Sequence, residues 1–496
     1  MKSQTQLGTP TNSRHLSTFS ATLIIIGNII GVGVFFKNIS VFSVNGNNAY
    51  GILISWLVGA LIAISTAVCI GKIAGIKTKK ENSGMAGWVT NILGPKAGNL
   101  LFALLPFCYF GFCAILFSVL ISEAFFSIIS TATDWTPHFG YIALFSVVIS
   151  VYFCVVNCFK PKFSNLFSKY GTMFKFIPIM TIITTGIIFA GIHGIDGSFF
   201  NGGTNGTNGI SKLSITAIFT CLPSVMFSFD GFSSAGSISS RIKNPEKGVP
   251  LAMLSAMIVA SVVYISVSLA EIFSGASSVF ALAGYIGNDD AEKAFNIVIA
   301  TFIFACTLFS CNGLTMAAVS TMQATAEENK IIGSKAVTKK FTKDLHAGGF
   351  YFLCTLLVVF LIFTLPCIIL NGDQILDISS NAIVVVFFFI YGTMIFVALI
   401  KFHLFTILQS CLAVFSSLMC VGLAGYFLVY SSIVKLIHDA NEPAGAGMLD
   451  GGSEQFKYYV VAIIFWASVI VFVGFALLNM FLMKSKDNKK QLATKK

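Results

Sequence analysis

The chain has 496 residues, of which 56% are hydrophobic and only 10% are charged, and its mean hydropathy is +0.86. A water-soluble domain cannot hide so much apolar surface, whereas apolar runs of about 18 residues or more can cross a bilayer. The composition therefore excludes a soluble protein and predicts a polytopic membrane protein. The net charge of +11 needs no nucleic acid partner, because most of the basic residues mark one side of the membrane.

Twelve apolar runs are expected to cross the membrane as helices, and the third is expected to kink at Pro106. In chain order they cover residues 16–36, 51–71, 100–129, 141–158, 172–190, 213–240, 249–273, 294–319, 350–370, 375–400, 404–430 and 458–483. Most of the 31 basic residues then lie on the side of the N-terminus, and basic loops face the cytoplasm. Both termini are therefore expected in the cytoplasm. The external loops keep only Lys37, Lys212, Lys293, Lys435 and Lys457.

The first span carries three glycines within residues 27–33. Glycine destabilises a helix interior by about 1 kcal/mol relative to alanine, and backbone groups freed in a bilayer need partners. A break at residues 31–33 would expose amides that attract an anion, while the carbonyls of Ile29 and Ile30 would face a cation. An amino acid, as a zwitterion, would satisfy both ends. The alternative interpretation is close helix packing through small residues.

Two ionisable residues fall inside the next spans. Glu123, late in the third span, is expected at the outer rim. Lys175 lies about one turn inside the fifth span, where its ammonium could reach back to the interface or project into the protein and take part in ion or proton coupling. Residues 310–313 of the eighth span could line the same pocket or serve helix packing. Asn38 and Asn205 start external glycosylation sequons.

The sixth span contains a second interruption, at Asp230 and Gly231. A carboxylate facing lipid is costly, so a break is the natural interpretation. Asp230 could cap the second half of the broken helix or contact a substrate ammonium directly. The break comes five spans after the first, and because five is odd, the sixth span enters the membrane from the opposite side. Paired interrupted helices of this kind indicate the central site of a secondary transporter.

No other motif indicates an enzyme, a metal site or a cofactor. The twelve cysteines form no Cys-x-x-Cys pair, and the six histidines lie at or outside span ends. The Gly/Asn-rich loop at residues 201–209 lacks the Gly-Lys-Ser/Thr of a nucleotide-binding loop. Transport driven directly by ATP on this chain is therefore excluded.

Both breaks lie in motifs that resemble the amino acid-polyamine-organocation (APC) superfamily, and the chain looks like one of its amino acid permeases. The first motif is Gly-Asn-Ile-Ile-Gly-Val-Gly-Val-Phe at residues 27–35, and the second is Phe-Ser-Phe-Asp-Gly-Phe at residues 227–232, followed by Ile-Lys-Asn-Pro at residues 242–245. Weaker echoes are Ser-Gly-Met-Ala-Gly-Trp at residues 83–88 and Thr-x-x-Lys at residues 172–175.

The resemblance implies an all-α, LeuT-like fold of two inverted five-helix repeats with two added helices, twelve transmembrane helices in all. The expected segments are a cytoplasmic tail at 1–15, the first repeat at 16–190, a flexible external loop at 191–212, the second repeat at 213–400, two further helices at 401–483 and a basic cytoplasmic tail at 484–496.

The resemblance also implies a substrate site. The substrate carboxylate would bind the amides of Gly31, Val32 and Gly33, and its ammonium would bind the carbonyls of Ile29, Ile30, Phe227, Ser228 and Asp230. Asn28 would brace the first break, Gly231 would open the second, Phe227 would act as an aromatic gate beside Phe229 and Phe232, and Lys175 would lie where relatives bind an ion. Ser233 and Arg241 stand where many members carry glutamate, which counts against proton coupling through those positions.

The sequence therefore predicts a secondary active transporter of amino acids in the plasma membrane, in contact with lipid and driven by protons or by exchange. Its aromatic walls favour neutral or apolar substrates, while Asp230 also admits cationic ones. A LeuT-like carrier of polyamines or other amines is the nearest alternative, although it would leave the amides of residues 31–33 without a partner. A channel, which would not saturate, or a membrane-embedded sensor, which would bind without flux, is the alternative from another class.

Overall fold

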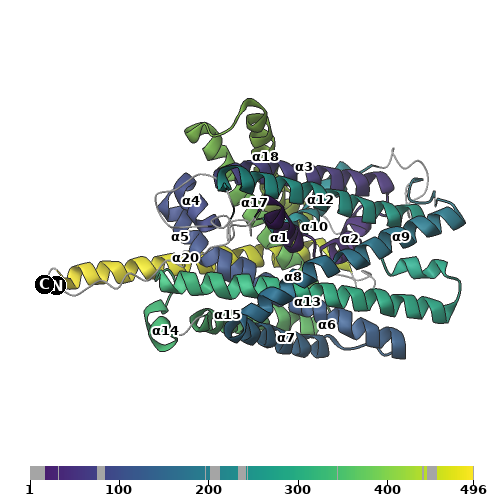
Figure 1. The fold of residues 1–496 in the computed structure, drawn as a ribbon, viewed down its shortest axis with the longest axis horizontal. Coiled ribbons are helices and arrows are strands. Elements are labelled where there is room, and N and C mark those ends of the chain that lie inside the picture. Colours follow the sequence, from purple (N-terminus) through teal and green to yellow (C-terminus); the bar gives the residue numbers. More distant parts are fainter. Residues whose placement is uncertain are drawn as a thin grey trace.

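The computed structural model describes residues 17–494, except residues 32, 75–83, 196, 202–212, 233–241, 243, 343–344, 438–440 and 444–454. The described chain is helical apart from connecting segments and two paired strands of three residues each, β1 (Asn441–Pro443) and β2 (Gln455–Lys457). The helices pack side by side along the long axis of the molecule (Figure 1). The predicted all-α polytopic membrane protein is confirmed.

Ten helices within the described ranges are long and apolar enough to cross a membrane. They are α3 (Ala49–Ala74), α5 (Pro95–Ala103) with η1 (Leu104–Gly111) and α6 (Phe112–Thr133), α7 (Phe139–Phe159), α8 (Pro161–Phe174) with α9 (Phe176–His193), α12 (Pro245–Ser274), α13 (Asp289–Glu327), α15 (His346–Val359) with η6 (Phe360–Thr364) and α16 (Leu365–Leu370), α17 (Gln374–Phe402), α18 (Ile407–Gly425) with η7 (Tyr426–Ser431) and α19 (Ser432–Ile437), and α20 (Tyr458–Thr494). Three short elements, α4 (Met85–Leu93), η5 (Ala281–Tyr285) and α14 (Ser334–Lys340), lie between them.

The predicted first and sixth spans appear instead as shorter apolar helices, α1 (Thr18–Ile29), α2 (Gly33–Val44) and α10 (Ile215–Phe229). The count of twelve stays a prediction, because residues 233–241 of the sixth span lie outside the described residues. The cytoplasmic tail at 1–15 and most of the loop at 191–212 lie outside them as well.

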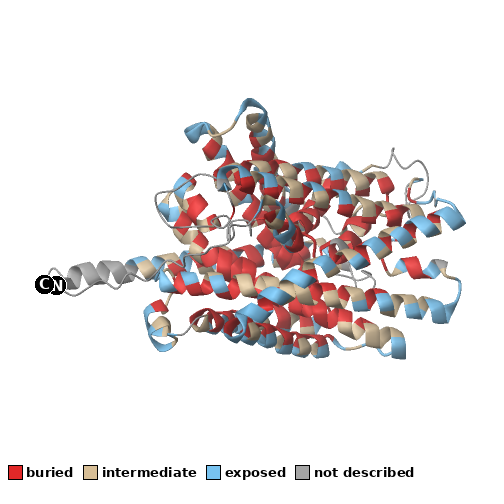
Figure 2. Cartoon of the chain, viewed as in Figure 1, coloured by how far each residue is buried: buried red, intermediate tan, exposed pale blue. Residues whose placement is uncertain are grey.

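The broken helices lie in the middle of the bundle (Figure 1). On one side α3 packs on α12, and on the other α6 and α15 pack on α13. Between them, α1 packs on α12 while α10 packs on α2, α3 and α17. Buried residues concentrate along this central region (Figure 2), whereas large apolar side chains such as Leu144, Ile187 and Leu418 are exposed on outward faces, as lipid contact requires. The fold thus surrounds both interruptions with protein.

Two predictions about the first span were wrong. The first span does not end at Phe36, because α2 continues to Val44, so Lys37 and Asn38 are buried in a helix rather than placed in an external loop. Hydropathy ends the span at Phe36 because it scores Lys37 and Asn38 as polar. It takes no account of the partners that these side chains have on other helices. The Asn38 side chain is hydrogen bonded inside the protein, so it is no glycosylation site. Glu123 is likewise buried, on α6.

Other local predictions fit the helices. Pro106 lies within the π-helix η1, the distortion that replaces a simple kink. Lys175 separates α8 from α9. Residues 484–494 of the predicted basic tail continue as part of α20.

Candidate substrate site

The first break is present in the structure. Helix α1 ends at Ile29 and α2 begins at Gly33, and between them Ile30 has an extended backbone with φ −73° and ψ 96°. Gly31 also lies between the two helices, whereas Val32, predicted to contribute an amide, lies outside the described residues. Backbone groups of this segment therefore leave the helical hydrogen-bond ladder in the middle of the protein.

The second break is present at the predicted residues. Helix α10 ends at Phe229, Asp230 is extended, and Gly231 has a φ of +125°, a region that favours glycine. Asp230 Oδ1 accepts a hydrogen bond from the Gly231 amide at 2.8 Å, so this carboxylate caps its own turn. Its other oxygen, Oδ2, is buried without a hydrogen-bond partner among the described residues, with Tyr109 of η1 beside the carboxylate. A buried acceptor without a donor is a suitable place for an ammonium group.

The two breaks lie against each other. A Cβ atom on Gly231 would be 2.8 Å from the Asn28 carbonyl oxygen, and a Cβ atom on Gly33 would be 2.8 Å from the Ser228 Cα atom. Only glycine permits these approaches of backbone to backbone. The prediction that the two interruptions face one another across one central region is thus supported by direct contacts from both sides.

Tyr264 of α12 joins the two breaks and was missed by the sequence analysis. Its hydroxyl lies 2.9 Å from the Ile29 carbonyl oxygen and 2.8 Å from that of Ser228, so its single proton can be donated to either. The ring is fully buried between Trp56 and Phe229, with centroids 5.4 and 5.2 Å away. Two carbonyls expected to hold the substrate ammonium therefore share one donor, the Tyr264 hydroxyl, in this structure. The available signal was a tyrosine inside an apolar span, whose hydroxyl needs a partner.

Lys175 points into the protein. Its side chain is buried, and its Nζ atom donates a hydrogen bond of 2.7 Å to the Gly27 carbonyl oxygen near the end of α1. The interpretation that it reaches back to the interface is therefore wrong.

Two residues of the predicted eighth span have different surroundings. Ser310 approaches Gly31, because a Cβ atom on Gly31 would lie 3.1 Å from the Ser310 Oγ atom. Asn312 instead binds Ser164 and Ser168 and so fastens α13 to α8.

The three candidate gate residues differ in their surroundings. Phe229 and Phe232 are fully buried, Phe229 against Trp56 and Phe232 against Tyr391, so they belong to the packed scaffold. Phe227 is partly exposed and borders a cavity of about 10 Å³, which is lined by Gly33, Phe36, Lys37, Leu116, Leu120, Phe227, Asp373 and Asp377. Of the three, Phe227 alone borders this cavity.

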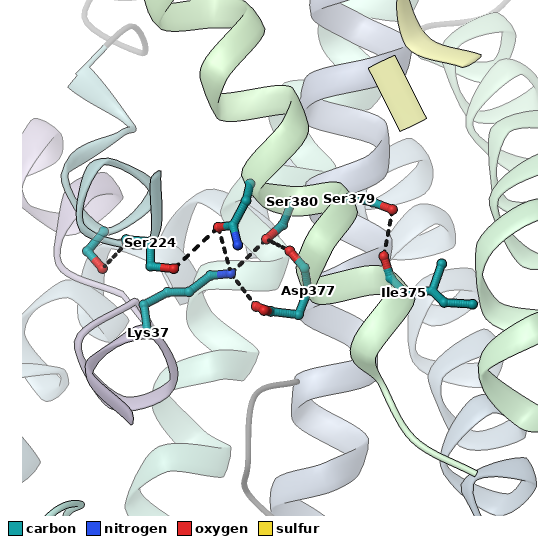
Figure 3. A network of polar contacts seen from close by, with 8 residues as sticks. Lys37, Ser224, Ile375, Asp377, Ser379 and Ser380 are labelled. Carbon is teal, nitrogen blue, oxygen red and sulfur yellow. Dashed lines mark hydrogen bonds and ion pairs between the residues drawn. The ribbon is translucent and has the colours of Figure 1, made fainter. Parts of the chain in front are cut away.

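A buried ion pair closes the same cavity on the side of α2, and it was also missed. The Lys37 ammonium pairs with the Asp377 carboxylate of α17 and donates to Ser380 Oγ at 2.7 Å and to Asn381 Oδ1 at 3.3 Å (Figure 3). The ammonium also lies 4.8 Å from the centroid of the Phe227 ring, a cation–π contact. These contacts fasten α2, the helix after the first break, to α17 and α10.

The arrangement thus brings the first break, between α1 and α2, against the second break, which carries a buried carboxylate. Among the described residues, no group of three or more His, Cys, Asp or Glu side chains could hold a metal ion.

Comparison with known proteins gives a consistent result. The model of the family described as "Amino acid permease" matches residues 16–494. The chain is 24% identical to the serine/threonine exchanger SteT of Bacillus subtilis, over 52% of this chain and 54% of that protein. It is 23% identical to the b(0,+)-type amino acid transporter 1 of Mus musculus, over 54% and 52%. It is 22% identical to the D-serine/D-alanine/glycine transporter of Escherichia coli K12, over 74% and 77%. The match spans about half the length of the first two relatives.

Proposed function

The chain belongs to the amino acid permease family, and from this premise we propose that it is a secondary active transporter that carries amino acids across the plasma membrane by alternating access. The family and its relatives are transporters, not enzymes, as the sequence predicted. The observation that carries the proposal is the contact between the two helix breaks, Gly231 against Asn28 and Gly33 against Ser228. Interrupted helices that meet in the protein interior are the usual substrate site of such carriers.

The proposed site keeps most of the predicted residues. It changes the role of Ile29 and Ser228, whose carbonyls were expected to bind the ammonium. The amides of Gly31, Val32 and Gly33 bind the substrate carboxylate. Because the Tyr264 hydroxyl lies against the carbonyls of Ile29 and Ser228, the ammonium binds Asp230 Oδ2 together with the carbonyls of Ile30 and Phe227, of which the Phe227 carbonyl also accepts from the Asp230 amide. Asn28 braces the first break through its carbonyl contact with Gly231. Phe227 closes the site on the side of α2.

The names of the relatives support small substrates. The cavity beside the first break, about 10 Å³, is no larger than one water molecule, so any substrate must enlarge it. Three of the relatives are named for serine, threonine, glycine, D-alanine, D-serine or glutamate. We therefore expect serine, alanine and glycine to be transported better than bulky amino acids.

Lys175 takes the place of a coupling ion, since its ammonium already binds the Gly27 carbonyl.

The orientation in the membrane follows from the distribution of basic residues. We propose that both termini face the cytoplasm, so that α2, α9 and α12 end at the outer face. The inverted repeats, at 16–190 and 213–400, then place their broken helices in opposite directions, as alternating access through one central site requires.

Uptake into proteoliposomes tests the function directly. Purified protein is reconstituted with or without internal amino acids, and initial uptake of a panel of labelled amino acids is measured. We expect saturable uptake of small neutral amino acids, and faster uptake into preloaded vesicles if the protein is an exchanger. Flux that does not saturate would indicate a channel, binding without flux a sensor, and equal competition by amines that lack a carboxylate an amine carrier. Each of these outcomes would overturn the proposal.

Replacing Tyr264 with phenylalanine is expected to raise the KM for amino acid uptake about tenfold. The change removes the one proton that either carbonyl, of Ile29 or of Ser228, can accept, and a buried acceptor left without a donor costs about 1–3 kcal/mol. The matched control is Tyr351→Phe, because the Tyr351 hydroxyl also donates to a carbonyl, that of Ile332, at 2.8 Å but away from both breaks. If both variants change KM equally, Tyr264 has no special role at the site.

A further inference from the structure

Glu271 is a buried carboxyl group that the transport site does not use. It lies near the end of α12, with 1% of its surface exposed, and it accepts a hydrogen bond from the Asn38 side-chain amide of α2. Asn38 Oδ1 in turn accepts from Trp56 Nε1 and Ser268 Oγ, both at 3.0 Å. These two donors fix the orientation of the Asn38 amide, so that its NH₂ group must point at Glu271. The contact therefore joins α12 to the helix that follows the first break.

Within the part of the chain that the structure describes, no cation faces this carboxyl group from the helices packed around it. On α2, Lys37 is engaged by Asp377. On α3, Lys72 lies about 24 Å along the helix from Trp56, at 1.5 Å per residue. On α9, Gly186 abuts Ala270, and from there Lys175 lies about 16 Å away along the axis in one direction and the exposed His193 about 10 Å in the other.

Among the described residues, α1 and α12 add no charge near Glu271 either. Helix α1 carries no charged residue. On α12 itself, Glu246 and Lys247 lie more than about 30 Å away along the axis, and the Tyr264 hydroxyl is held by the two break carbonyls. An ionised carboxylate buried with one neutral amide partner would cost several kcal/mol. The contact between α2 and α12 therefore favours the neutral acid form of Glu271 over the carboxylate.

We propose that Glu271 is a proton-binding site whose occupancy is linked to the position of α2, an inference that rests on the proposed function. When α2 moves away from α12 to open the site, water reaches Glu271 and takes its proton; when α2 closes, the carboxyl group takes a proton back from water and Asn38 returns to it. Substrate binding also favours the closed position, since the amide of Gly33 at the start of α2 belongs to the substrate site. Protons and substrate therefore assist each other's binding, with equal coupling in both directions.

Transport measurements at different external pH test the linkage. In proteoliposomes with the internal pH fixed, the KM for external substrate in the wild-type protein should rise by up to tenfold per unit increase in external pH, because closure takes up one proton. Glu271→Gln keeps a side-chain oxygen for Asn38 but does not titrate, so its KM should not change with pH. Glu123→Gln, a change at another buried carboxyl group on α6, should keep the wild-type dependence. A flat wild-type profile, or an unchanged profile in Glu271→Gln, would overturn the proposal.

Two further measurements keep the test independent of the variant and of the transport assay. In weakly buffered solution, wild-type protein should take up about one proton per substrate bound, and no uptake would contradict the linkage even if Glu271→Gln does not fold. Without any substrate, hydrogen exchange of the α2 backbone amides, corrected for intrinsic rates, should slow at low pH in the wild type but not in Glu271→Gln. A positive result here with no amino acid uptake would reject the proposed transport function and leave the proton site standing.

Discussion

Replacing Gly231 with alanine is expected to reduce amino acid transport at least 100-fold. The new Cβ atom would lie 2.8 Å from the Asn28 carbonyl oxygen, closer than real Cβ contacts come, and the neighbour is backbone that cannot rotate away. Alanine is also disfavoured at a φ of +125°, a strain of about 1–3 kcal/mol. Together these effects must push the two breaks apart. Initial uptake in proteoliposomes measures the loss.

The chain offers matched controls for this substitution. Gly422 of α18 and Gly474 of α20 are helical glycines whose added Cβ atoms would meet nothing within 4 Å. Alanine at either position should leave transport unchanged and should stabilise the helix slightly, by up to about 1 kcal/mol. Thermal unfolding of all three variants separates loss of the site from loss of the fold. Wild-type transport by Gly231→Ala would show that the breaks do not meet as described.

Replacing Lys37 with methionine is expected to destabilise the protein by about 3–5 kcal/mol. The change leaves the Asp377 carboxylate buried without its cation, and an uncompensated buried charge is far more costly than the loss of the pair itself. It also removes the contacts of α2 with Ser380 and Phe227, so transport should fall with stability. Thermal unfolding in detergent and uptake measure the two effects.

The double variant Lys37→Met with Asp377→Asn tests whether the unpaired charge of Asp377 causes the loss of stability. Because it removes both charges, it should recover most of the stability lost in the single variant. Lys293→Met is a control at an exposed pair, where Nζ lies 3.0 Å from Asp134 and both side chains are largely in solvent. There the loss should stay within about 1 kcal/mol. A double variant as unstable as Lys37→Met alone would show that lost packing, and not the unpaired charge, is responsible.

The sequence by itself determined the fold class, the family and the position of both breaks. These properties depend on local quantities: apolar run length, the low helix preference of glycine, and the cost of a carboxylate such as Asp230 in lipid. The family motifs also predicted that Lys175 could project inward, although the residues alone left its direction open. Its hydrogen bond to Gly27 required the packed helices.

Only the tertiary structure decided which polar groups are paired and which aromatic rings line the site. Hydropathy placed Lys37 and Asn38 outside the membrane because their partners, Asp377 and Glu271, are remote in sequence. Likewise, nothing local to Tyr264 shows that its hydroxyl reaches two carbonyls on two other helices. Burying a polar group costs little free energy only when another helix supplies its hydrogen bond. Whether it does depends on how the helices pack, which no single segment encodes.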